Sequence, residues 1–273
     1  MPYSKSGTAY DLNGPPEAPV LVLVHGLGLT RGTWDAFVPH LARNYRVVTY
    51  DLTGHGESPL PSERPDLTIL SGQLVRLMDE LSVDRASIIG FSLGGMINRR
   101  IAIDHPSRVA SLVILNSPHE RSPEAQRLVE ERAAQTAEGG PAATIDSTLE
   151  RWFTPEFLTS APDKVAQARA WVLANDPVTY AAFRQVLATG VIELIRPTPA
   201  IMVPTLVMTC ENDSGSTPAM SKAIASEIAG AETLIVPGLQ HLGLIERPEL
   251  FTQPMLRFLA RSEARLEMTG AKP

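Results

Sequence analysis

Ser92 lies in a short pattern that can turn a serine hydroxyl into a nucleophile. The segment Gly90-Phe91-Ser92-Leu93-Gly94 follows an apolar run and precedes a stretch of helical character. In such a G-x-S-x-G turn, a strand ends and a helix begins at one exposed serine. We expect Ser92 to take a strained backbone conformation, and side chains at Gly90 or Gly94 would collide across so tight a bend. The pattern predicts that Ser92 is a catalytic nucleophile.

Two later residues can supply the partners that a serine nucleophile needs. A serine hydroxyl requires a base within hydrogen-bond distance and a carboxylate that orients this base. Asp213 and His241 each follow a short apolar run, and the carboxyl ends of parallel strands meet at one edge of a sheet. The chain order Ser, Asp, His is one of the known orders of such triads. We therefore expect Ser92, Asp213 and His241 to form a catalytic triad, with Glu211 as an alternative acid.

These three residues require a sheet whose strand ends lie side by side. Apolar segments alternate with amphipathic helical segments along 1–117 and 197–273, which is typical of a mostly parallel sheet covered by helices. Residues 118–196 are almost wholly helical in pattern, so the sequence predicts an α/β core, 1–117 and 197–273, interrupted by an inserted helical cap, 118–196. Core strands are expected at 8–12, 20–24, 46–50, 86–89, 109–116, 205–209 and 233–236, and core helices at 34–43, 68–81, 96–104, 218–228 and 248–260. Cap helices are expected at 124–138, 144–152, 164–173 and 178–188.

Three local features predict details of this arrangement. The segments 8–12 and 20–24 are separated by Asn13-Gly14-Pro15-Pro16, which favours a hairpin-like pair. Pro254 lies inside the last core helix, where a kink or a restart is expected. The final residues, 268–273, are expected to fray.

The composition excludes several classes of protein. The chain of 273 residues has 44% hydrophobic and 20% charged residues and a net charge of −6, as expected of a soluble globular protein without a nucleic-acid partner. Its single cysteine, Cys210, excludes an internal disulfide. The apolar run Val20–Val24 is too short to span a membrane, and no secretory signal is visible. A cytoplasmic protein without membrane contact is expected.

The same survey bears on cofactors and partners. The sequence contains no histidine, cysteine and acidic residues at zinc-ligand spacing and no glycine-rich dinucleotide fingerprint. No metal and no organic cofactor are therefore expected. The expected partner is a small-molecule substrate, and the oligomeric state is left open, with a homo-oligomer among the alternatives.

Further segments, together with the serine turn, carry a family likeness. They are His25-Gly26, Gly54-His55-Gly56-Glu57-Ser58, Pro204-Thr205-Leu206-Val207, Thr217-Pro218 and Glu246-Arg247-Pro248-Glu249, and in the insertion Arg151-Trp152-Phe153-Thr154 and Asp176-Pro177. With these segments the sequence resembles the α/β-hydrolase superfamily over nearly its whole length. It resembles most the small bacterial 3-oxoadipate enol-lactonases and carboxylesterases. Three positions depart from that type: Gln240 replaces a usual glycine, Thr53 replaces a common arginine, and Ser214-Gly215-Ser216 belong to a loop one residue longer than usual.

The resemblance implies an α/β-hydrolase fold and a specific chemistry. The implied reaction is hydrolysis of a carboxylic ester or lactone of a small molecule through an acyl-enzyme. The backbone N–H groups of Leu27 and Leu93 are expected to form the oxyanion hole. His25 and Trp152 are candidates for lining the substrate pocket.

Other functions stay open. A C–C bond hydrolase of a ring-fission diketone would use the same triad, and a non-catalytic relative could bind a ligand on the same fold. An enol-lactone substrate carries a carboxylate, so a basic residue is expected near the pocket. The sequence leaves Arg31 and Arg151 as alternatives for this residue.

The remaining histidines are expected to have structural roles. His25 and His55 lie in loops near the predicted site and are expected to brace those loops rather than to do chemistry. His40, His105 and His119 are expected at the surface.

Overall fold

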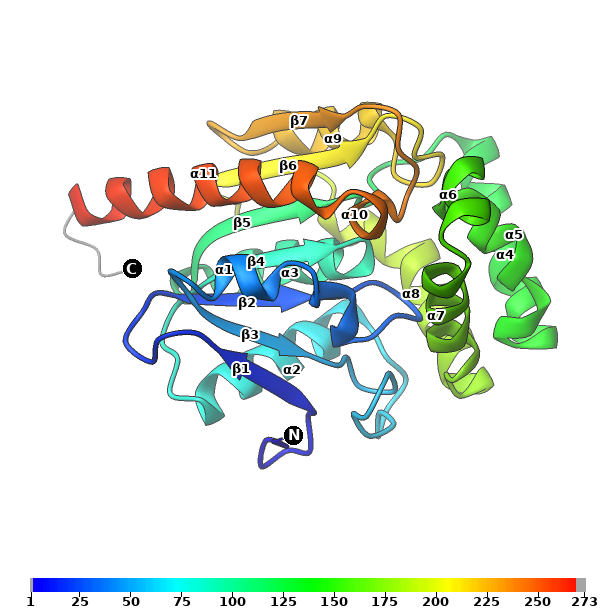
Figure 1. The fold of residues 1–273 in the computed structure, drawn as a ribbon, viewed down its shortest axis with the longest axis horizontal. Helices are drawn as coiled ribbons and strands as arrows, with labels where there is room; N and C mark the ends of the chain where they lie inside the picture. The colour runs from blue at the N-terminus through cyan, green and yellow to red at the C-terminus, as the bar shows by residue number, and fades with distance from the viewer. Residues whose placement is uncertain (1, 269–273) are drawn as a thin grey trace.

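A computed structural model describes residues 2–268, and within them one sheet of seven strands forms the centre of the molecule (Figure 1). The strand order is β1-β3-β2-β4-β5-β6-β7. β1 runs antiparallel to β3, and the other neighbouring pairs are parallel. The mostly parallel sheet expected from the sequence is confirmed. The strands are β1 (Tyr10–Asn13), β2 (Val20–Val24), β3 (Arg46–Tyr50), β4 (Ala86–Phe91), β5 (Val109–Leu115), β6 (Thr205–Cys210) and β7 (Glu232–Val236).

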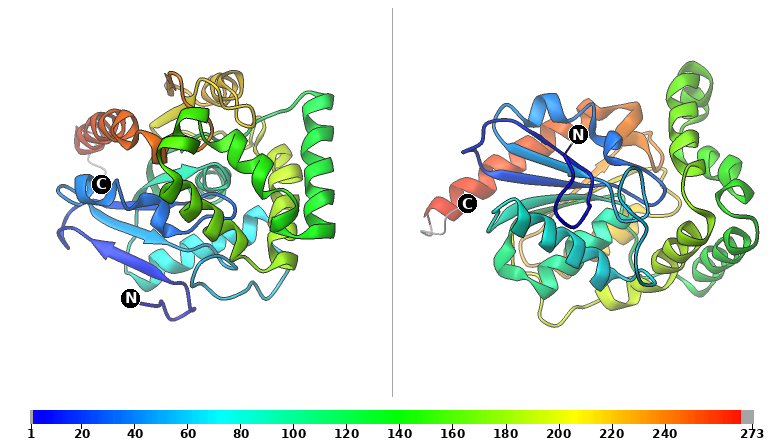
Figure 2. Two further views of the ribbon diagram at one scale, coloured as in Figure 1. Left: turned by 45° about the vertical axis from the view of Figure 1, so that its right-hand side comes forward. Right: turned by 90° about the horizontal axis from the view of Figure 1, so that it is seen from below.

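Helices cover both faces of the sheet. α1 (Val38–Leu41) and α11 (Pro248–Met268) lie on one face, whereas α2 (Leu67–Glu80) and α3 (Leu93–Asp104) lie on the other (Figures 1 and 2). The central strands β4 and β5 are consequently buried at every residue, which explains why both are continuous apolar runs. The core also contains η1 (Arg31–Trp34), η2 (Pro106–Arg108), α9 (Pro218–Ser226) and α10 (Gly243–Glu246).

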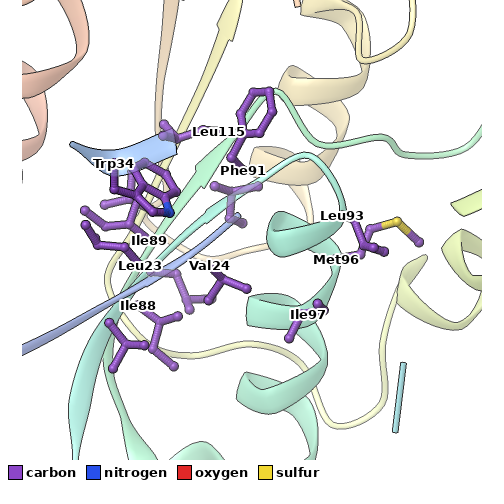
Figure 3. Packing of buried hydrophobic residues seen from close by; sticks show 14 of the residues in the cluster. Leu23, Val24, Trp34, Ile88, Ile89, Phe91, Leu93, Met96, Ile97 and Leu115 are labelled. Carbon is purple, nitrogen blue, oxygen red and sulfur yellow. The ribbon is translucent and has the colours of Figure 1, made fainter. Parts of the chain in front are cut away.

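The core next to the serine turn is tightly filled by side chains from several elements. Figure 3 shows this cluster, to which β2, β4, β5 and α3 all contribute. Such packing holds side chains in fixed rotamers and transmits strain, so β4 and α3 form a rigid support for the serine between them. The labelled residues are Leu23, Val24, Trp34, Ile88, Ile89, Phe91, Leu93, Met96, Ile97 and Leu115.

The segment between β5 and β6 is helical and lies beyond the carboxyl ends of the strands (Figures 1 and 2). Within it α4 packs against α8, and α5 packs against α7. The predicted division into a core and a cap, 118–196, stays a proposal, to which we return below. The helices are α4 (Pro123–Gly139), η3 (Pro141–Ala143), α5 (Ile145–Trp152), α6 (Pro155–Ser160), α7 (Pro162–Leu173), α8 (Pro177–Thr189) and η4 (Gly190–Leu194).

The predicted hairpin at the start of the chain is wrong. β1 pairs with β3, from Tyr10 opposite Tyr50 to Asn13 opposite Val47, and not with β2. Both edges of β2 are already occupied by its parallel neighbours β3 and β4. The first strand can therefore extend the sheet only at the free edge of β3.

Several helices differ from the prediction. The helix expected at 34–43 is replaced by the short η1 and α1, and α6, α10, η2, η3 and η4 were not predicted. α11 continues through Pro254 to Met268, so the helix does not restart there. Its apolar face, which includes Phe251, Met255 and Phe258, is buried, and this packing offsets the hydrogen bond that proline cannot donate.

The expectation that His119 lies at the surface is also wrong. Its side chain is buried, and its Nε2 atom lies 3.2 Å from a carboxylate oxygen of Glu227. The neighbouring Pro118 accepts a hydrogen bond of 2.7 Å from the buried guanidinium of Arg99 through its carbonyl oxygen. This contact draws the segment that carries His119 into the interior.

Two remaining points concern the C-terminus and the length and apolar character of the helices. Fraying was expected for residues 268–273; Met268 is the last residue of α11, and residues 269–273 lie outside the described residues. Across residues 2–268, none of the helices combines the length and the apolar character that crossing a membrane requires.

Candidate active site

Ser92 occupies the sharp turn between β4 and α3. Its backbone angles, φ 55° and ψ −111°, lie in a region that costs a non-glycine residue free energy. A Cβ atom on Gly90 would lie 2.1 Å from the carbonyl oxygen of Gly94, and one on Gly94 would lie 2.2 Å from that of Val24. The steric role expected of these two glycines is therefore confirmed. The strained turn is held by a hydrogen bond of 2.8 Å from the Ser92 N–H to the carbonyl oxygen of Leu115.

The structure brings Ser92, His241 and Asp213 together at the carboxyl edge of the sheet. The Oγ atom of Ser92 lies 3.2 Å from Nε2 of His241. On the other side of the imidazole, Nδ1 lies 2.6 Å from Oδ2 of Asp213. Asp213 is buried, while the side chain of His241 keeps 13% of its surface exposed. The three side chains form one continuous hydrogen-bonded chain that ends at the serine hydroxyl.

Asp213 is held as an ionised acceptor. Besides the imidazole, it accepts hydrogen bonds of 2.9 Å each from the side-chain amide of Asn116 and the N–H groups of Gly215 and Ser216. Burial opposes its ionisation, but the charge of His241 and these hydrogen bonds outweigh burial and hold its pKa below the ordinary value. An ionised Asp213 requires Nδ1 of His241 to carry a proton, so Nε2 is free to accept the proton of Ser92.

Three of these hydrogen bonds come from residues to which the sequence assigned no role. The loop of unusual length after Asp213 supplies both N–H donors, from Gly215 and Ser216. Asn116 was not predicted, although it follows β5 at the same sheet edge by the rule that located Asp213. The alternative acid, Glu211, is exposed and accepts a hydrogen bond from the N–H of Gly238. The structure thus places Asp213, and not Glu211, against the imidazole.

The loop after β2 passes directly beside the serine. A Cβ atom on Gly26 would lie 3.2 Å from Cβ of Ser92 and 3.0 Å from the ring of Phe91. Leu27 follows in this loop, and Leu93 is the first residue of α3. The backbone N–H groups of both have no acceptor in the part of the chain that the structure describes. They are free to donate to an oxygen bound next to Ser92.

His25 does not line the cavity that opens beside Ser92, so the expectation that it lines a pocket is wrong. Its side chain has no exposed surface. Its Nδ1 donates to the carbonyl oxygen of Gly26 at 2.8 Å, and its Nε2 accepts from the N–H of Leu52 at 3.0 Å. Burial, aided by the nearby charge of Arg31, lowers the pKa of His25 to about 4. The neutral ring thus braces two loops, which is the other role expected of it.

A cavity opens at the triad and is walled on its far side by the helical insertion. The space open to the centres of water molecules is about 70 Å³, several times the roughly 10–15 Å³ that one water needs. The predicted Trp152 lines it, with its ring centroid 6.2 Å from that of His241. The lining residues also include Leu27, Phe91, Ser92, Pro118, Val129, Leu187, Asp213, His241 and four arginines, Arg121, Arg132, Arg151 and Arg184.

The structure separates the two arginines that the sequence left as alternatives. Arg151 lines the cavity. Arg31 does not line it, because its guanidinium forms ion pairs with Asp51, Glu57 and, at 2.7 Å, Asp11. Arg31 therefore ties loops of the core together.

Three further cavity arginines were not predicted, although the sequence contains a signal for two of them. On an exposed helix face an arginine commonly has an acid three or four residues away, as Arg127 has Glu131 and Arg100 has Asp104. Arg132 in α4 and Arg184 in α8 have no acid at these spacings. Arg121 precedes α4 and offers no comparable signal.

The insertion also holds the loop that carries His241. The N–H of Leu242 donates to the carbonyl oxygen of Trp152 at 2.8 Å, and the side chain of Gln240 donates to that of Glu150 at 3.1 Å. Thr154 donates from both its N–H and its hydroxyl to Glu246, at 2.8 Å each. Gln240 stands where glycine is usual and directly precedes His241 in the chain. Its side chain thus connects the end of α5 to the loop that carries the imidazole.

The sheet, the serine turn and the position of the site define a hydrolase of the α/β class. The family model described as the alpha/beta hydrolase fold matches residues 19–248. The chain belongs to this family, as the resemblance of its sequence motifs indicated.

Individual relatives refine this placement. The chain is 30% identical over 247 residues to 3-oxoadipate enol-lactonase 1 of Acinetobacter baylyi, covering 89% of each chain. The crystal structure of the enol-lactonase from Burkholderia xenovorans superposes with a TM-score of 0.87 at 30% identity, covering 95% of this chain and all of that one. A thermophilic esterase from Thermogutta terrifontis, with malate bound, gives a TM-score of 0.82 at 26% identity and covers 93% of both chains.

Proposed function

We propose that this protein is a serine hydrolase that cleaves a carboxylic ester or lactone of a small molecule through an acyl-enzyme. The observation that carries this proposal is the hydrogen-bonded chain from Ser92 through His241 to Asp213, which opens into a cavity. The enol-lactonases and the esterase among its relatives support the same type of bond. No step of the reaction requires a metal or an organic cofactor.

The reaction follows from the roles of the three side chains. His241 accepts the proton of Ser92 at Nε2 while Oγ bonds to the substrate carbonyl carbon, and Asp213 stabilises the imidazolium that forms. The carbonyl oxygen becomes an oxyanion that the N–H groups of Leu27 and Leu93 can stabilise. As the tetrahedral intermediate collapses, the bond to the leaving alkoxide breaks and the alkoxide takes the proton from His241.

Hydrolysis of the acyl-enzyme repeats these steps with water. His241 removes a proton from the water molecule, whose oxygen attacks the acyl carbon, and the proton then passes to Oγ of Ser92. In a lactone the leaving alkoxide stays attached to the acyl group, so both ends are released together as a hydroxy acid. The α/β core would supply this chemistry, and the helical cap, 118–196, would close the cavity over the substrate.

Covalent labelling of the nucleophile tests the proposal. A fluorophosphonate should modify Ser92, as peptide mass analysis can show, and the Ser92→Ala variant should remain folded but take up no label. Absence of an adduct at Ser92 in the folded wild-type protein would favour a ligand-binding role without catalysis. A panel of aryl esters, small lactones and ring-fission diketones then sorts the chemistry. Faster turnover of the diketones than of both other groups would contradict the proposal.

A further inference from the structure

The cavity that contains Ser92 is unusually rich in arginine. Arg121 precedes α4, Arg132 lies in α4, Arg151 in α5 and Arg184 in α8, and all four line this cavity. These arginines come from the insertion, which Figure 2 shows gathered along one end of the sheet. The cavity wall opposite the nucleophile therefore carries a concentration of positive charge.

None of these four guanidinium groups has a carboxylate partner within residues 2–268. The ion pairs of the described residues use other arginines instead: Arg31, Arg100, Arg108, Arg127, Arg169, Arg247 and Arg261. Asp213 is the one carboxylate that lines the cavity, and it is occupied by its four hydrogen bonds. The four cavity arginines are thus without an ion pair among the described residues, and Asp213 is the carboxylate that shares the cavity with them and partly offsets the charge of Arg151.

The four arginines differ in how many of their donors have acceptors. Arg121 donates to the carbonyl oxygens of Leu187 and Ala188 at 3.1 and 3.2 Å, and Arg151 donates to its own helix, to the carbonyl oxygen of Ser147 at 3.1 Å and the hydroxyl of Thr148 at 3.2 Å. Within residues 2–268, Arg184 has two buried donors without an acceptor, Nε and Nη2, whereas Arg121 has one, Nε. The guanidinium carbon of Arg184 lies 5.8 Å from the ring centroid of Tyr180. Buried donors without acceptors cost free energy, and an anion in the cavity would satisfy them.

Arg132, Arg151 and Arg184 also repel one another. Burial and the charges of Arg132 and Arg184 lower the pKa of Arg151 to about 10. Burial and the charge of Arg184 likewise lower the pKa of Arg132. All three guanidinium groups line the same cavity, and holding like charges together there without anions disfavours the folded state.

We propose that Arg132, Arg151 and Arg184 form a binding site for a substrate that carries two carboxylate groups. A single carboxylate would neutralise one of the three charges and leave two positive charges in the cavity. Two carboxylates can bind three guanidinium groups through charge-assisted and bidentate hydrogen bonds. This inference rests on the serine hydrolase function proposed above and names the substrate class of that same site.

Three aryl esters with the same scissile bond test this specificity. They are phenyl butanoate, monophenyl succinate and a monophenyl ester of propane-1,2,3-tricarboxylic acid, which carry zero, one and two free carboxylates. We expect kcat/KM to rise at least tenfold from the second ester to the third. A neutral ester hydrolysed as efficiently as the dianionic one would overturn the inference.

Matched substitutions locate the effect. Arg132→Gln and Arg184→Gln should each lower kcat/KM for the dianionic ester tenfold or more, mainly through KM, and this loss should be at least fivefold larger than the loss on phenyl butanoate. Arg127→Gln is the control, since Arg127 lies in α4 like Arg132 but pairs with Glu131 outside the cavity lining. An equal loss on neutral and dianionic esters would assign the arginines to the fold and contradict the inference.

Binding without turnover separates this inference from the proposed function. The Ser92→Ala protein should bind propane-1,2,3-tricarboxylate in calorimetry, and Arg184→Gln in that background should weaken binding tenfold. Such binding together with no ester hydrolysis by the wild type would leave the arginine site standing and refute the hydrolase. Ester hydrolysis by the wild type without tricarboxylate binding would support the hydrolase function and refute the arginine site. Tighter binding of inorganic phosphate than of the tricarboxylate would overturn the dicarboxylate assignment in favour of a phosphorylated substrate.

Discussion

The sheet side and the insertion side of the molecule, which meet at the cavity beside Ser92, differ in how completely they satisfy their own charges. On the sheet side, Asp213 accepts four hydrogen bonds, and the core arginine Arg31 forms ion pairs with three carboxylates. On the insertion side, Arg184 has buried donors without acceptors, and neither it nor Arg132 has a carboxylate partner among the described residues. A carboxylate whose hydrogen bonds are complete without ligand suits chemistry that is the same for every substrate. Arginines whose hydrogen bonds and charge only a bound anion would satisfy suit recognition of a particular substrate.

The largest effect is expected from the sheet side, at the carboxylate of the triad. Asp213→Asn removes the charge that keeps the proton on Nδ1 of His241, so Nε2 can no longer act as the base. We expect kcat/KM for any hydrolysed ester to fall by about 10⁴-fold, whether or not the ester carries a carboxylate. Steady-state kinetics on a neutral and an anionic ester measure this.

Glu211→Gln provides the matched control for that substitution. Glu211 lies two residues from Asp213 but is exposed and contacts the N–H of Gly238. Its substitution should change kcat/KM less than threefold. A large loss at Glu211 and a small one at Asp213 would show that the acid acts from a position other than the observed one.

Acid should destabilise the sheet side through its buried histidines. Burial, with the charge of Arg31, lowers the folded-state pKa of His25 from 6.5 to about 4. Between these values the unfolded chain binds a proton that the folded chain excludes, so stability is lost as the pH falls from about 6.5 to about 4. The loss from His25 alone is about 3 kcal/mol. Urea unfolding at a series of pH values measures it.

Substitutions can isolate this contribution from that of other groups. His25→Gln should flatten the pH dependence of the free energy of unfolding over this range, even if its stability at neutral pH is lower. His40→Gln, at an exposed position, should leave the slope unchanged. An unchanged slope in His25→Gln would mean that the folded protein protonates His25 as readily as the unfolded chain does.

The site residues on the sheet side were also the ones that the sequence allowed us to predict. Ser92 lies in a turn whose glycines are dictated by close backbone approach. Asp213 follows β6, which is buried throughout, and His241 follows the edge strand β7, whose apolar residues lie at its carboxyl end. Local constraints of this kind leave a pattern in a few consecutive residues. The same approach failed for β1, because its pairing depends on which strand edge remains free after β2 has found its neighbours.

The insertion side left little pattern in the sequence. Arg132 and Arg184 lie on different helices, and their meeting depends on how α4 packs against α8, which hydrophobic spacing does not specify. His119 was misplaced for a similar reason, since its burial depends on a contact between Pro118 and Arg99 that is distant in sequence. The one signal in the sequence was that Arg132 and Arg184 have no acidic residue three or four positions away. This signal becomes informative only when the two are compared with arginines that do have such a partner, such as Arg127.

Gln240 connects the two sides, and its substitution should have a moderate effect. Gln240→Ala removes the hydrogen bond to the carbonyl oxygen of Glu150 and loosens the position of His241 relative to α5. We expect kcat to fall about fivefold with little change in KM, since the loss of one hydrogen bond is worth about 1 kcal/mol. Gln253→Ala, at an exposed position of α11, should have no effect. A change in KM alone would place Gln240 in substrate binding instead.

The smallest expected effect is a gain in stability from Arg184→Gln, whereas most substitutions destabilise a protein. Arg184→Gln gives up a cation–π contact worth about 0.5–1 kcal/mol but relieves the repulsion with Arg132 and Arg151 and removes buried donors that lack acceptors. We expect the free energy of unfolding, measured with urea at low ionic strength without ligand, to rise by about 0.5 kcal/mol. Arg127→Gln, which breaks an exposed ion pair, should lower it by about 0.3 kcal/mol. If Arg184→Gln instead lost more than about 1 kcal/mol, a usual cost of deleting a stabilising contact, the insertion side would be as self-sufficient as the sheet side, and an anion would no longer be needed to complete it.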